Sequence, residues 1–112
     1  MIAHLVLLQP KPDLTEDQRA DALATIRNAA ANLPDVRRFS LGRRVTHGLP
    51  GYEQLMKQDF AFALIVEVED IEALTRYLQA PAHAALGQLF YTASAAALAY
   101  DYELDEEISA AS

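Results

Sequence analysis

The chain has 112 residues, of which 52% are hydrophobic and 22% are charged, which is typical of one globular domain. Sixteen acidic residues against nine Lys and Arg give a net charge of −7, which argues against a nucleic-acid partner because such proteins carry a basic face. The chain contains no cysteine and no secretory signal pattern, so we expect no disulfide and a cytoplasmic location. Its longest uncharged stretch near the end, 92–100, is far shorter than the roughly 20 apolar residues of a membrane helix.

The first two predicted elements are a strand and a helix. The apolar run 2–8, followed by Pro10, predicts a short buried strand. Thr15 and Gln18 have the spacing of a capping box, in which two orphan helix donors are satisfied reciprocally. The apolar spacing that follows predicts an amphipathic helix over 15–32.

Two further strands flank a long loop in the middle of the chain. Alternating apolar and polar residues predict a half-exposed strand over 36–45. The Gly- and Pro-containing segment 46–59 predicts a loop, in which we expect His47 to be exposed. The nearly continuous apolar run 60–68 predicts a central strand.

The last third of the chain predicts two short helices and a final strand. Asp70 is a favoured N-cap for the first helix, and four of its residues are expected to face inward: Ile71, Leu74, Tyr77 and Leu78. Pro81 occupies the favoured first position of the second helix, whose apolar stripe comprises Ala82, Leu86, Leu89, Phe90 and Ala93. Alternation at Leu98, Tyr100 and Tyr102 predicts the last strand.

The resulting order, β-α-β-β-α(α)-β, predicts an α+β domain with the ferredoxin-like βαββαβ topology and an antiparallel sheet. In this topology the first and third strands are central, the second and fourth are edges, and the helices cover one face. The other face needs cover, and a second copy of the chain is its expected source. We therefore predict a homodimer.

Charge also predicts how the two copies meet. The second strand carries four arginines and the C-terminal region carries five acids: Arg37, Arg38, Arg43 and Arg44, against Asp101, Glu103, Asp105, Glu106 and Glu107. Because both strands are predicted edges, we expect them to pair across a subunit boundary. An alternative in which the arginines grip an anionic ligand is less favoured, since such a strand is more often a solvated or dimer-facing edge.

Several motifs occur in the order and spacing of one known family: Lys11-Pro-Asp-Leu-Thr-Glu16, Leu33-Pro-Asp-Val36, Ile71-Glu-Ala-Leu74, Tyr77-Leu78, Pro81-Ala-His83 and Tyr100-Asp-Tyr-Glu103. On these residues the chain resembles the stress-responsive A/B barrel (Dabb) domains along nearly its whole length. The resemblance implies a Dabb domain over 1–104, followed by an acidic tail over 105–112. It also implies a homodimer whose two sheets form an α/β barrel.

The resemblance extends to a plant polyketide cyclase of that family, which closes a linear polyketide by an aldol condensation without a cofactor. The catalytic Tyr and His of that enzyme match Tyr77 and His83, and a His of its first strand matches His4. Ile26 and Phe62 stand where the cyclase has a Tyr and a His. The resemblance therefore implies the same catalytic pair in a more apolar pocket that takes a different substrate.

The residue types suit this chemistry, because an aldol step needs a base beside a carbonyl and a donor for the oxyanion. The resemblance implies that His83 is the base and Tyr77 the donor, and both residues share the inward faces of their predicted helices. The predicted substrate-binding residues are His4, Val6, Ile26, Phe62, Leu64, Leu86 and Phe90. An enzyme should contain a cavity of a few hundred Å³ that touches His83 and Tyr77.

Two hypotheses follow from different classes of protein. The first is a cofactor-free lyase or cyclase that acts on a small apolar or phenolic oxo-compound. The second is a non-catalytic stress-response or ligand-binding barrel, in which the same residues only pack. A cofactor-independent oxygenase is a weaker third possibility. No metal is expected, because the three His have no ligand spacing and the chain has no Cys, and no cofactor fingerprint is present.

Overall fold

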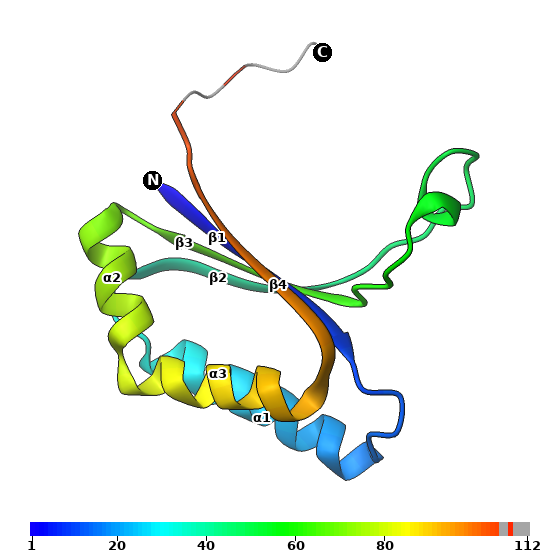
Figure 1. Cartoon of the computed structure of the whole chain (residues 1–112). Helices are drawn as coiled ribbons and strands as arrows, with labels where there is room; N and C mark the ends of the chain where they lie inside the picture. The colour runs from blue at the N-terminus through cyan, green and yellow to red at the C-terminus, as the bar shows by residue number, and fades with distance from the viewer. Residues whose placement is uncertain (106–107, 109–112) are drawn as a thin grey trace.

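A computed structural model describes residues 1–105 and 108. The elements are β1 (Ile2–Pro10), α1 (Glu16–Asn32), β2 (Val36–Arg43), the 3₁₀ turn η1 (Glu53–Leu55), β3 (Phe62–Val68), α2 (Ile71–Gln79), α3 (Pro81–Ala93) and β4 (Ser94–Glu103). The strands form one antiparallel sheet in the order β2-β3-β1-β4, and the three helices lie on one side of it (Figure 1). The predicted ferredoxin-like α+β fold and its two edge strands are therefore confirmed.

The helix boundaries are set by the predicted capping residues. The Thr15 hydroxyl oxygen accepts a hydrogen bond from the Gln18 N–H, and Oε1 of Gln18 accepts one from the Thr15 N–H, so the capping box of α1 is complete. The Asp70 carboxylate accepts from the Ala73 N–H at the start of α2. Pro81 begins α3, where a missing N–H costs nothing.

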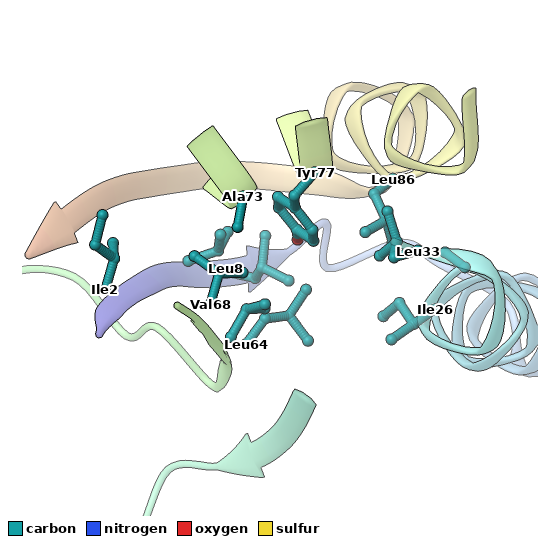
Figure 2. Packing of buried hydrophobic residues seen from close by; sticks show 12 residues of the cluster. Ile2, Leu8, Ile26, Leu33, Leu64, Val68, Ala73, Tyr77 and Leu86 are labelled. Atoms are coloured by element: carbon teal, nitrogen blue, oxygen red, sulfur yellow. The ribbon is translucent and has the colours of Figure 1, made fainter. Parts of the chain in front are cut away.

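Strand β1 determines which side chains face the helices. Its burial alternates, with Ile2, His4, Val6 and Leu8 buried. The three apolar residues of this set belong to the main hydrophobic core, together with residues of β3 and all three helices (Figure 2). The predicted inward face of β1 is confirmed, and it places His4 between the sheet and the helix layer.

The prediction for α2 is wrong at two of its four inward residues. Ile71 is 61% exposed and Leu78 is 39% exposed, whereas Ala73 and Tyr77 are buried. Residues four apart lie on one face of a helix, and successive residues turn by about 100°. Once Ala73 and Tyr77 define the inward line, Ile71 and Leu78 must point away from it.

The second face of the sheet is apolar and has no helix over it. It exposes Ile65 and Leu98 at 40% each and Tyr100 and Tyr102 at 52% each. The connection 44–61 projects beyond the sheet, away from the helices (Figure 1). In the part of the chain that the structure describes, no helix is long and apolar enough to cross a membrane. Most of the predicted acidic tail, 106–107 and 109–112, lies outside the described residues.

Candidate active site

Three aromatic side chains from three different elements converge between the sheet and the helices. His4 comes from β1, Tyr77 from the last half of α2, and His83 from the first turn of α3. The ring centroids are 5.1 Å apart for Tyr77 and His83, 5.3 Å for His4 and Tyr77, and 6.4 Å for the two histidines. The structure thus brings the predicted pair and the predicted pocket histidine into one cluster.

Local sequence explains why Tyr77 and His83 meet. Ala80 is the C-cap of α2 and also the N-cap of α3, in an extended conformation, because a residue before a proline avoids the helical region. The chain therefore turns sharply between two helices that share one boundary residue. Tyr77 lies one turn before that boundary and His83 one turn after it, which leaves their rings face to edge.

Asp101 is a fourth member of the cluster, which the sequence alone did not predict. Nδ1 of His4 lies 2.5 Å from Oδ1 of Asp101, because the antiparallel register of β1 and β4 places these residues directly opposite each other. A carboxylate only accepts hydrogen bonds, so Nδ1 of His4 carries the proton of this hydrogen bond. The sequence did contain a signal for the position of Asp101. Because Leu98, Tyr100 and Tyr102 alternate on one face of the last strand, Asp101 must lie on its opposite face.

Tyr77 is held as a protonated hydroxyl. Its side chain is almost completely buried, at 1% exposure, and points from α2 toward the sheet (Figure 2). Burial, and then the negative charge of Asp101, raise the pKa of Tyr77 to about 12, because both disfavour the phenolate. At neutral pH the group can therefore donate a hydrogen bond but does not ionise.

His83 is held as a neutral ring. Its pKa is lowered by partial burial first and by the positive charge that His4 could carry second, since both disfavour the imidazolium. Its position in the first turn of α3 acts in the same direction, because the positive end of the helix dipole repels a cation. A neutral imidazole can accept a proton, which is what a general base requires.

An apolar cavity of about 180 Å³ is lined by residues of the four strands and of α1 and α3. Three predicted substrate-binding residues line it, namely Ile26, Phe62 and Phe90. The prediction of a cavity that touches Tyr77 and His83 is wrong for this cavity, which includes neither residue. Fully buried Leu86 occupies the turn of α3 between His83 and Phe90. The other predicted substrate-binding residues, His4, Val6, Leu64 and Leu86, are buried in the core and do not line it.

The arginines of β2 and its flank are largely neutralised within the chain. Arg37 pairs with Glu69 at 3.0 Å, Arg38 with Glu67 at 3.5 Å, and Arg44 with Asp59 at 2.8 Å. Of these four arginines, Arg43 alone has no ion pair with residues 1–105 and 108. Asp101 likewise bonds His4. Fewer of these charges are therefore free to pair between two copies of the chain than the sequence predicted.

His47 stays apart from the cluster, as predicted. It is exposed in the connection 44–61, where Nε2 lies 3.4 Å from Oε2 of Glu53 and its ring packs against Tyr52. Glu53 also accepts the backbone N–H groups of His47 and Gly48, which lowers the pKa of its carboxyl, the Gly48 contact contributing most. His47 serves this connection and has no part in the site.

The fold and the ring cluster define a ferredoxin-like domain with a polar site between its sheet and its helices. The family pattern described as the stress responsive A/B barrel domain matches residues 2–104, so the chain belongs to the Dabb family. Olivetolic acid cyclase of Cannabis sativa is a curated relative, 24% identical over 101 residues that span 90% of this chain and 94% of the cyclase.

Solved structures share the fold. Hydroxynitrile lyase from Passiflora edulis superposes with a TM-score of 0.78 at 15% identity and 96% coverage of both chains. A dimeric ferredoxin-like protein of unknown function from Thermobifida fusca gives 0.72 at 18% identity, covering 92% of this chain and 90% of its own. These likenesses support the architecture, and the second describes a protein that is a dimer.

Proposed function

We propose that the protein is a cofactor-free lyase or cyclase that acts on a small, largely apolar oxo-compound. The observation that carries this proposal is the convergence of a neutral His83, a protonated Tyr77 and the carboxylate-bonded His4. Titratable groups whose pKa values are shifted by burial and by neighbouring charges are typical of active sites. The similarity to olivetolic acid cyclase supports the same class of chemistry.

The proposed reaction begins with proton removal from the carbon beside a carbonyl. His83 accepts that proton and the carbonyl oxygen becomes an enolate, which the Tyr77 hydroxyl stabilises by donating a hydrogen bond. In a cyclase the enolate carbon attacks a second carbonyl of the same molecule, forming a carbon–carbon bond and an alkoxide. The alkoxide then takes the proton back from the His83 imidazolium, so the base is restored.

His4 and Asp101 position this pair. The hydrogen bond to Asp101 fixes the tautomer and the ring orientation of His4, whose ring packs edge-on against Tyr77. Removing His4 should therefore change substrate binding or the orientation of the pair more than it changes the chemistry itself.

A second candidate function is a non-catalytic small-ligand-binding barrel. It is favoured by the nearly complete burial of Tyr77 and by the separation of the cavity from the catalytic pair. In that case the side chains of the cluster only pack in the core, where their buried polar atoms have hydrogen-bond partners, and the cavity alone binds a ligand.

Exchange of ketone protons distinguishes the two functions without a known substrate. The wild type should speed the exchange of the protons beside the carbonyl of octan-2-one for deuterium, followed by proton NMR in D₂O. His83→Ala should slow this exchange by about 10²–10⁴-fold, and Tyr77→Phe by about 10²–10³-fold, with the fold unchanged by circular dichroism. His47→Ala is the matched control and should leave the rate unchanged. Full activity in His83→Ala and Tyr77→Phe, or no exchange above buffer in the wild type, contradicts the proposal.

The assembly belongs to the same proposal. We propose a homodimer in which the open face of the sheet, defined by Leu5, Ile65, Leu98, Tyr100 and Tyr102, contacts a second copy. An exposed apolar face of this kind is typical of an interaction surface, and the Thermobifida fusca protein of the same fold is a dimer. The cytoplasmic location predicted from the sequence stays a prediction.

A further inference from the structure

The connection 44–61, which we call the arm, exposes a set of apolar side chains that the proposed site does not use. Five of them are exposed at 56–83%, namely Val45, Leu49, Tyr52, Leu55 and Met56. A single exposed apolar side chain is ordinary, but five on one connection are typical of an interaction surface. The arm extends past the ends of β2 and β3 on the side of the sheet away from the helices (Figure 1), which is the side of the open face.

The polar groups of the arm are bonded within it. The Glu53 carboxylate accepts the backbone N–H groups of His47 and Gly48, and Arg44 pairs with Asp59 at 2.8 Å across the base of the arm. These contacts order the backbone while the apolar side chains remain in water, which is the reverse of a loop adapted to solvent. A surface that is ordered before it binds loses less conformational entropy on association.

The charges of the arm indicate the kind of partner that it fits. Arg44 and Asp59 neutralise each other, and Glu53 lies beside His47. Lys57 is thus the one charged side chain of the arm without an ion pair to the described residues 1–105 and 108. Anionic lipids and nucleic acids attract clusters of Lys and Arg, whereas this chain has a net charge of −7. The arm is therefore suited to an apolar protein surface.

The open face is such a surface, and it is too small to hold two copies together alone. Its four large exposed side chains, Ile65, Leu98, Tyr100 and Tyr102, leave about 300 Å² of apolar area in water. A stable interface takes about 800 Å² from each partner, and about 65% of that area is apolar between identical subunits. The arm side chains add a similar area to that of the open face, because they are smaller on average but more exposed. Together the two surfaces reach what a stable dimer needs.

We infer that the arm packs on a second copy of the chain, beside the open face, so that each subunit of the dimer contacts the arm of the other. The inference rests on the proposed homodimer for the identity of the partner. A two-fold axis makes the contact occur twice, so every apolar side chain of the arm is buried two times in one dimer. The open-face contact and the arm contact involve different residues, so each can be removed without the other.

Sedimentation equilibrium over a dilution series tests the arm. Leu55→Asp should raise the dissociation constant of the dimer by at least about 100-fold, because each of the two copies loses one buried Leu. Ile71→Asp is the matched control, since it adds the same charge at a similarly exposed position of α2, and should leave the dissociation constant unchanged. Both variants should keep the circular dichroism spectrum of the wild type, because neither side chain belongs to the core.

A fluorescence measurement reports on the same contact independently. The chain has no Trp, so a single introduced Trp reports only its own surroundings. Leu55→Trp should emit at a shorter wavelength in the dimer and shift to a longer wavelength on dilution. Ile71→Trp should emit as an exposed Trp at every concentration. Emission of Leu55→Trp that stays unchanged while the dimer dissociates would overturn the inference.

The outcomes distinguish the arm from the open face. A dimer that Ile65→Asp weakens and Leu55→Asp does not overturns the inference and leaves the proposed dimer standing. A dimer that only Leu55→Asp weakens supports the arm contact and contradicts the open-face contact, and a monomeric wild type overturns both. Co-sedimentation with phosphatidylcholine–phosphatidylserine vesicles tests a lipid surface instead. Vesicle binding that Leu55→Asp removes while the dimer persists would assign the arm to a membrane and overturn the inference.

Discussion

Truncation of Leu86 to Ala should both destabilise the protein and join its cavity to the catalytic pair. Leu86 is 0% exposed and stands between His83 and the cavity residue Phe90 on α3. The substitution removes three buried carbons and leaves space that the helix cannot close. Leu→Ala changes at fully buried sites cost about 3–5 kcal/mol, a large fraction of the about 5–15 kcal/mol by which domains are stable.

The matched control is Leu89→Ala on the same helix. Leu89 is only partly buried and already faces the cavity, so its truncation should cost about half as much. Urea unfolding followed by circular dichroism gives both values from the midpoints, provided that the slopes agree. In Leu86→Ala, octan-1-ol should also raise the Tm more than in the wild type, since the enlarged cavity binds more of it. A loss for Leu86→Ala no greater than that for Leu89→Ala would refute the packing argument.

Two further predictions concern pH and assembly. Because the pKa of His83 is lowered in the folded state, the unfolded chain takes up the proton first as pH falls through about 6.5. His83 therefore contributes stability above that pH and loses it below, and His83→Gln should flatten this part of the urea midpoint-against-pH curve. For assembly, light scattering at micromolar concentration should give a dimer that Ile65→Asp on the open face dissociates. Ile71→Asp on α2, exposed at 61%, should leave the dimer intact, and a monomeric wild type contradicts the proposed assembly.

The sequence predicted most of the fold because local signals and tertiary packing agree in this chain. The capping box at Thr15, the cap at Asp70 and the first-turn Pro81 each act within a few residues, so sequence reading located them correctly. The inward side of α2 was harder to predict, since Ile71 and Leu78 are as apolar as the residues that are buried. Ala73 and Tyr77 are the residues that pack toward the sheet instead. The apolar periodicity of a nine-residue helix alone does not predict that choice.

The candidate site residues Tyr77, His83 and His4 came from the resemblance to the plant cyclase, and their roles stay predictions. The alternation of β1 predicted only the face of the strand on which His4 lies. Asp101 is 97 residues from His4, and only the register of β1 with β4 joins them. The place of the cavity also depends on how Leu86 fills the space between elements, and no spacing rule contains that information.

The two faces of strand β4 contact different parts of the molecule. Asp101 faces the helix layer and holds His4, while its neighbours Tyr100 and Tyr102 lie on the open face of the sheet. Tyr100 and Tyr102 flank Asp101 in the chain, so a contact on the open face lies one residue away from the carboxylate that bonds His4. As an edge strand, β4 is paired with β1 alone in the described sheet, and the Asp101 side chain is itself 40% exposed. The carboxylate that orients buried His4 is therefore reached both by solvent and by whatever contacts the open face, through one strand.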